Sequence, residues 1–87
     1  NSYYHLVNIT HDMLPGNEYE HILVSFDDNE GKGIHQIYIT DDRLDRFLQG
    51  NTIHYEEMFY TTEKPVKVVY WGFSKTKGWA ERVEFKL

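Results

Sequence analysis

Acidic side chains recur in three clusters along this chain and are its most regular chemical feature. A row of carboxylates can take the place of phosphates in a basic protein, because each strand of nucleic acid carries one charge per ~3.4 Å of axis. Each cluster alone is more typical of a solvated loop or a helix N-terminus. We predict that together they bind a basic partner through Asp27, Asp28, Glu30, Asp41, Asp42, Asp45, Glu56 and Glu57.

Histidines are the other candidates for chemistry, but their spacing does not favour a metal site. None of the five falls into an HxH, HxxxH or HExxH pattern. The chain has no cysteine, which excludes disulfides and thiolate chemistry, and it has no nucleophile or phosphate-loop motif. We expect no catalytic residue, no metal and no cofactor, and we predict that the protein is not an enzyme. His21 and His35 are expected on adjacent strands, where they could face each other.

The stretch from residue 67 to residue 85 holds both tryptophans and four of the nine basic residues. We interpret this stretch first as the hydrophobic half of a hairpin, since such rings are usually buried. If the helix covers the other side of the sheet, however, Trp71 and Phe73 stand exposed. They could then form a dimer or partner surface. They could also stack on nucleic-acid bases, with Lys67, Lys75 and Lys77 contacting phosphates. Because three lysines on an otherwise acidic chain make a small basic footprint, we do not expect direct nucleic-acid binding.

The elements that position these residues follow from hydrophobic periodicity. Alternation predicts strands at residues 3–10, 19–27, 34–40, 66–74 and 79–87. Leu44, Phe47 and Leu48 have helical spacing, with Thr40 or Asp41 as the N-cap and Gly50 as the stop. Residues 53–60 fit either a strand or a short helix.

The element order predicts an α+β domain over residues 1–87. We expect a mainly antiparallel sheet of about five strands, with one short helix after the third strand. The strands at 19–27 and 34–40 should be antiparallel neighbours, which places two acidic clusters at opposite ends of one sheet. Alternation puts Val68 and Tyr70 on one face of the 66–73 strand and Trp71 and Phe73 on the other.

The net charge of −5 is unevenly divided. Residues 1–62 carry eleven acids against three bases, giving −8, and residues 63–87 carry three acids against six bases, giving +3. A core this small favours a homodimer. No apolar run reaches the ~18 residues of a membrane span and no leader is evident, so we expect a cytoplasmic location.

This profile resembles the small acidic DNA-mimic proteins of tailed bacteriophages, which inhibit host restriction nucleases. The likeness lies in length, absence of cysteine, abundance of Tyr, Asn, Ile and Lys, and the paired carboxylates at 27–28, 41–42 and 56–57. It implies a non-catalytic anti-restriction inhibitor in the host cytoplasm that presents acids to a basic DNA-binding protein. The chain departs from the most acidic mimics in its basic C-terminal hairpin. Two alternatives stay open: a single-stranded nucleic-acid-binding module that uses this hairpin, and a structural interaction subunit.

Overall fold

The computed structural model describes residues 2–87, which form six strands and one helix. In chain order these are β1 (Ser2–Ile9), β2 (His21–Asp27), β3 (Gly33–Ile39), α1 (Asp42–Leu48), β4 (Ile53–Tyr60), β5 (Lys67–Ser74) and β6 (Trp79–Lys86). The predicted strands and helix are confirmed, and the helix follows the third strand as expected. The segment that fitted either period is a strand, β4, in which Ile53 and Phe59 are buried and alternate residues between them are exposed.

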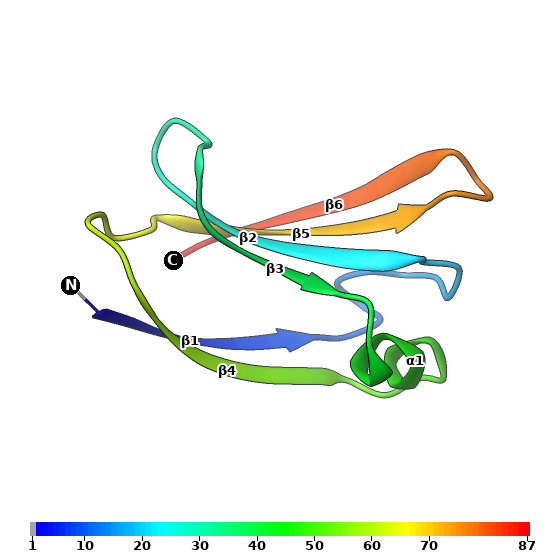
Figure 1. Ribbon diagram of the computed structural model, residues 1–87. Helices are drawn as coiled ribbons and strands as arrows, with labels where there is room; N and C mark the ends of the chain where they lie inside the picture. The colour runs from blue at the N-terminus through cyan, green and yellow to red at the C-terminus, as the bar shows by residue number, and fades with distance from the viewer. Residues whose placement is uncertain (1) are drawn as a thin grey trace.

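The strands form two antiparallel sheets, so the expectation of one sheet with about five strands is wrong. β3, β2, β5 and β6 make a four-stranded sheet in that order, while β1 and β4 make a two-stranded ribbon. The ribbon pairs Ser2 with Tyr60 and Ile9 with Ile53. The two sheets lie face to face, with the ribbon below the four-stranded sheet in Figure 1. The α+β, mainly antiparallel character is confirmed.

The hydrophobic core fills the space between the two sheets. β2 supplies Ile22, Val24 and Phe26, and each of these side chains is at most 1% exposed. β1 supplies Val7 and Ile9 to the same core cluster. Burying an aliphatic or aromatic side chain of this kind contributes roughly 1.5–3 kcal/mol, so the contact between the layers is the main source of stability.

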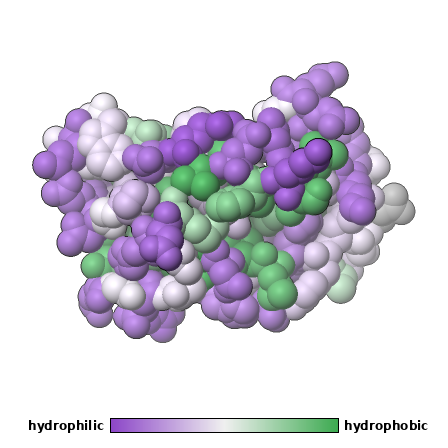
Figure 2. All heavy atoms as spheres, turned by 180° about the vertical axis from the view of Figure 1, so that it is seen from behind, coloured by the Kyte–Doolittle hydropathy of each residue, from purple (hydrophilic) through white to green (hydrophobic). Residues whose placement is uncertain are grey.

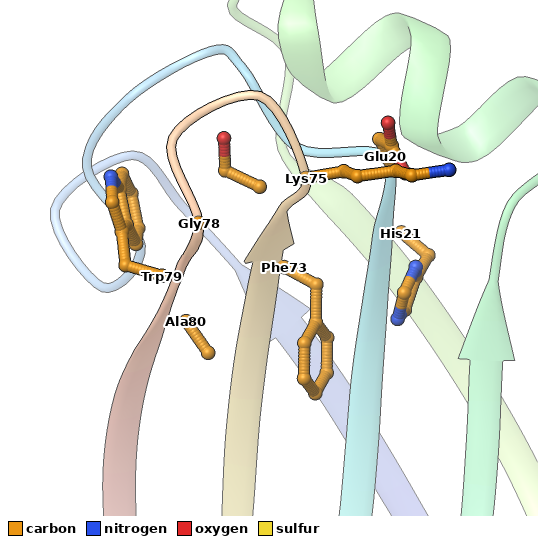
Figure 3. A pocket seen from close by; sticks show the side chains of 8 residues that line it. Glu20, His21, Phe73, Lys75, Gly78, Trp79 and Ala80 are labelled. Atoms are coloured by element: carbon orange, nitrogen blue, oxygen red, sulfur yellow. The ribbon is translucent and has the colours of Figure 1, made fainter.

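The helix closes one end of this core. Asp41 is the N-cap, and its side chain accepts a hydrogen bond from the backbone N–H of Arg43. Leu44 and Phe47 are buried in the common core, while Gly50 ends the helix at φ 107°. Within residues 2–87 the one helix, α1, packs on the inner side and leaves the outer side of the four-stranded sheet uncovered (Figures 1 and 3).

The two-stranded ribbon is narrower than the sheet that it covers. Phe85 of β6 and the following Leu87 are 40% and 54% exposed. On the side opposite to that of Figure 1, apolar side chains form a band between polar borders (Figure 2). The sandwich is therefore open along part of its core. No helix in residues 2–87 is long and apolar enough to cross a membrane.

Candidate binding face

The outer side of the four-stranded sheet carries two neighbouring rows of side chains that run across the strands. Strand register places Tyr38, Leu23, Trp71 and Arg82 in one row. It places His21, Phe73 and Ala80 in the next row, two residues away from the first row on each strand and nearer the β5–β6 turn. Aromatic rings from three strands therefore meet on one surface.

These rings are in mutual contact. The ring of His21 stacks on that of Phe73 at 4.5 Å and 22°. The ring of Trp71 is near-parallel to that of Phe73 at 6.1 Å, and Tyr38 lies 5.6 Å from His21. Tyr38 is 61% exposed, whereas the other three rings are half-buried. We call His21, Tyr38, Trp71 and Phe73 the aromatic face.

Basic side chains border the aromatic face. The guanidinium of Arg82 lies over the Trp71 ring, 5.2 Å from its centroid, a distance at which cation–π attraction operates. Arg82 also donates to Glu84 at 2.6 Å, and Lys67 lies 3.6 Å from the same carboxylate. The hydrogen bond from Arg82, and then the nearby charge of Lys67, hold the pKa of Glu84 below its usual value. Lys86 projects outward on β6 beside Lys67.

A pocket of about 420 Å³ lies at one end of the aromatic face, where the β5–β6 turn meets the start of β2. We call it the end pocket. Phe73 and Ala80 form its floor, and their side chains point to the same side of the sheet as that of His21 (Figure 3). Its other lining residues include Glu20, Lys75 and Trp79.

Four of the eight predicted partner-binding acids have local structural roles. Asp27 is 7% exposed and accepts a hydrogen bond from the Ser25 hydroxyl. Asp28 accepts from the backbone N–H groups of Glu30 and Lys32, both at 2.9 Å, and so shapes the β2–β3 turn. The other two are the helix cap Asp41 and Glu57, which contacts His35 at 2.8 Å.

The remaining four acids are exposed but lie on separate elements. Glu30 is in the β2–β3 turn, Asp42 and Asp45 are in α1, and Glu56 is on the outside of β4. Figure 1 places the β2–β3 turn and α1 at opposite ends of the sandwich, as expected for two of the clusters. The pKa of Glu56 is lowered, first by a hydrogen bond from Tyr4 and also by His54.

The histidines do not gather into a metal site. The strands of His21 and His35 are neighbours as expected. His21 lies on the outer side of the sheet, whereas His35 pairs with Phe26 at the other end of β2, so the two do not face each other. His35 instead stacks on Phe59 at 4.4 Å and contacts Glu57. Within residues 2–87, no group of three His, Cys, Asp or Glu residues is arranged to hold a metal ion.

The outer side of the β1–β4 ribbon is a second exposed surface. It consists of eight exposed residues, of which only Glu56 is formally charged. Its four large apolar side chains are all more than half exposed. We call this surface the ribbon face, and these side chains are Tyr4, Leu6, Met58 and Tyr60.

Sequence reasoning found only part of the aromatic face. It predicted the shared direction of Trp71 and Phe73, which the register confirms. It did not predict that His21, Tyr38 and Arg82 lie beside these two rings, because that placement depends on the pairing of β2 with β5 and on the register of β3 and β6. His21 and Leu23 are two residues apart on one strand and therefore point to the same side. This alternation was the signal in the sequence that could have placed His21 on the outer side. Comparison with models of protein families, with curated proteins and with solved structures finds no match to this chain.

Proposed function

We propose that this chain is a non-catalytic module that binds single-stranded nucleic acid on the aromatic face. The observation that carries the proposal is the set of contacting rings on the uncovered side of a four-stranded sheet. Sheets of this kind bind single strands by stacking bases on two or three rings. Each stacked base contributes about 1–3 kcal/mol, and stacking tolerates any base sequence because every base has a π face.

The charge distribution supports this proposal despite the net charge of −5. Lys67, Arg82 and Lys86 project from the outer side of β5 and β6, where the exposed acid is Glu84. Of the predicted acids, Asp27 ends β2 opposite Lys67 but is only 7% exposed. The others lie in the β2–β3 turn, in α1 and its cap, and on β4. The molecule extends 37 Å along its longest axis, and charges are largely screened beyond ~8 Å at physiological salt. A strand on the aromatic face would therefore meet mainly the local basic groups.

A direct titration tests this function. Fluorescence anisotropy of a labelled nine-nucleotide RNA or DNA strand at physiological salt should rise on addition of the protein. Trp71→Ala and Phe73→Ala should each weaken binding roughly tenfold, as expected for the loss of one stacked base. Tyr60→Ala is the matched control, since Tyr60 is 77% exposed but lies on the ribbon face. An absence of binding at millimolar protein, or an equal loss with the control, would overturn the proposal.

Inhibition of a basic DNA-binding protein is the second candidate function, and the observation that favours it is the exposure of Glu30, Asp42, Asp45 and Glu56. Such an inhibitor should not bind nucleic acid itself. It should capture DNA-binding proteins from a bacterial lysate and lose them to excess duplex DNA. Lysine at Asp42, Asp45 and Glu56 should abolish that capture without unfolding the chain. A partner retained at high salt would instead indicate an apolar docking surface.

A further inference from the structure

We propose that the end pocket holds one guanine base of the bound strand. The proposal rests on the proposed function, since it assigns a base preference to one end of the aromatic face. The pocket volume of about 420 Å³ is within the ~300–1,000 Å³ of small-ligand sites. Its lining combines an aromatic ring, a carboxylate and an ammonium, which together match the chemistry of a nucleobase.

The stacking surface in the pocket exists because of two neighbours of Phe73. On the β2 side, His21 stacks on Phe73 and holds the ring in place at 4.5 Å. On the β6 side, the residue opposite Phe73 is Ala80, whose single methyl group leaves that side of the ring open. Trp79 lines the pocket next to Ala80, and its ring meets that of Tyr19 edge-on at 6.0 Å. A flat base fits beside Phe73 in the space that the alanine leaves.

The polar groups stand together at one rim of the pocket. Glu20 immediately precedes β2, and its backbone N–H donates to the carbonyl of Phe73 at 2.8 Å. Lys75 immediately follows β5, which runs antiparallel to β2. Glu20 and Lys75 therefore extend from the same end of the sheet, and Figure 3 shows both side chains above Phe73 and His21.

This pair of charges selects among the bases. A carboxylate only accepts hydrogen bonds and an ammonium only donates them. Guanine is the base whose Watson–Crick edge offers two adjacent donors, N1–H and the 2-amino group, next to the acceptor O6. Glu20 would accept from both donors while Lys75 donates to O6 or N7. Adenine and cytosine place an acceptor next to their amino group, where it would face the carboxylate.

The two tryptophans allow the pocket and the aromatic face to be observed separately. Trp71→Phe keeps a ring on the aromatic face and leaves Trp79 as the fluorescent reporter of the pocket. Trp79→Phe does the converse. The probes are guanosine and adenosine monophosphate, and uridine nine-mers that carry a single guanine or adenine at either end or in the middle. The Trp79 reporter should respond to guanine with about tenfold higher affinity than to adenine.

Three variants test the named contacts. Glu20→Gln should remove the guanine preference while leaving adenine binding unchanged, since an amide offers one donor and one acceptor. Glu18→Gln is the control, because Glu18 contacts Lys77 and does not line the pocket. Ala80→Leu should fill the space beside Phe73 and abolish the Trp79 response while the Trp71 reporter still detects the strand.

Each contrary result has a distinct meaning. A strand that changes Trp71 but not Trp79 fluorescence would overturn the pocket and leave the proposed function standing. Equal responses to guanine and adenine would overturn the base assignment alone. If guanosine monophosphate changes Trp79 fluorescence but no nucleic-acid strand changes Trp71 fluorescence, the pocket binds a free nucleotide. That result would contradict the proposal that the base belongs to a bound strand. Silence from both reporters would overturn the proposed function and the pocket together.

Discussion

The ring of Tyr19 lies directly on the backbone of Gly72. A Cβ atom at position 72 would stand 2.5 Å from Cε1 of Tyr19, closer than real Cβ atoms approach other atoms. The Tyr19 hydroxyl donates to the carbonyl of Pro15, and the ring contacts Trp79. Tyr19 thus fixes the β1–β2 connection against the C-terminal hairpin and supports one wall of the end pocket.

Gly72→Ala should therefore destabilise the protein by about 1–3 kcal/mol, the usual cost of overpacking a buried site. Chemical denaturation followed by tyrosine and tryptophan fluorescence measures this change. Gly33→Ala is the comparison, because the nearest atom to its new Cβ is the side-chain end of Gln36 and can move away. If both variants unfold at the same denaturant concentration, the contact between Tyr19 and Gly72 does not constrain the fold.

Asp41 should matter for stability more than its exposed position suggests. Its carboxylate accepts from the backbone N–H of Arg43 at 3.0 Å and also pairs with the Arg43 guanidinium. These hydrogen bonds, led by the one from the Arg43 side chain, hold the pKa of Asp41 below its usual value. Asp41→Ala should lower the urea midpoint at neutral pH. Since the lowered pKa stabilises the fold only while Asp41 is ionised, the difference should shrink as pH falls through the acidic range.

Asp42→Ala and Asp45→Ala are the controls for this prediction. Both residues are exposed acids of α1, and neither caps it. If all three variants lose the same stability, the cause is the charge of the first turn and not the cap. The same comparison decides how the acidic-inhibitor hypothesis should be tested, because a charge reversal at Asp41 would alter the helix as well as the surface.

Local sequence patterns predicted the elements because each depends on neighbouring residues. The spacing of Leu44, Phe47 and Leu48 is sufficient to identify a helical face, and Gly50 marks its end. Alternation in β5 likewise separated Val68 and Tyr70 from Trp71 and Phe73. These predictions needed no knowledge of partners.

Pairing between distant strands could not be read in the same way. β1 pairs with β4, which lies more than forty residues further along the chain, and nothing in the alternation of residues 3–10 distinguishes β4 from β2 as the partner. The aromatic face and the end pocket both depend on the pairing of β2 with β5 and β6. Burial of a charged residue was equally hidden in the sequence. Asp27 was predicted to lie on the surface because of its residue type, but it is buried beside Ser25.

Protonation of His5 should lower the stability of the protein. The imidazole packs 4.3 Å from the ring of Phe26 and 5.1 Å from that of Phe59. Burial, and then the nearby His35, lower the pKa of His5 in the folded state. Between that lowered pKa and the unfolded value of ~6.5, the unfolded chain binds more protons, so stability falls as pH decreases through this window.

His5→Phe removes the titrating group while keeping an aromatic ring in the same place. Its melting temperature should vary less between pH 7 and pH 5 than that of the parent. Both proteins keep the contact between His35 and Glu57. His54→Gln serves as an exposed control. Parallel pH profiles for His5→Phe and the parent would show that His5 does not contribute to acid sensitivity.

Salt dependence should report the basic border of the aromatic face. Contacts of Lys67, Arg82 and Lys86 with three phosphates predict a slope of about −2 in a plot of log affinity against log salt, at roughly −0.7 per phosphate of a single strand. Lys86→Ala should reduce this slope by about 0.7. Lys64→Ala should leave it unchanged, since Lys64 lies in the β4–β5 connection. Equal slopes for the two variants would exclude a phosphate contact at Lys86.

Self-association should use the ribbon face and not Trp71 and Phe73, the residues first expected to form a dimer surface. Directly opposed Tyr4 and Met58 are 55% and 56% exposed, and Glu56 is the one formal charge among the eight residues of this face. Interface cores are depleted in charged residues and enriched in Tyr and Met. A twofold axis would bring two copies of this face together, and Glu56 would be the one residue per copy that contributes like-charge repulsion.

Sedimentation equilibrium at micromolar concentration should therefore detect a dimer that persists at high salt, because apolar contact is not screened. Met58→Glu should give a monomer. Tyr38→Glu introduces the same charge at an equally exposed position on the opposite sheet and should leave the dimer intact. A dimer that is lost with Tyr38→Glu but kept with Met58→Glu would place the contact on the aromatic face, where it would compete with nucleic acid. A monomer for the unaltered chain would show that the ribbon face does not bind a second copy.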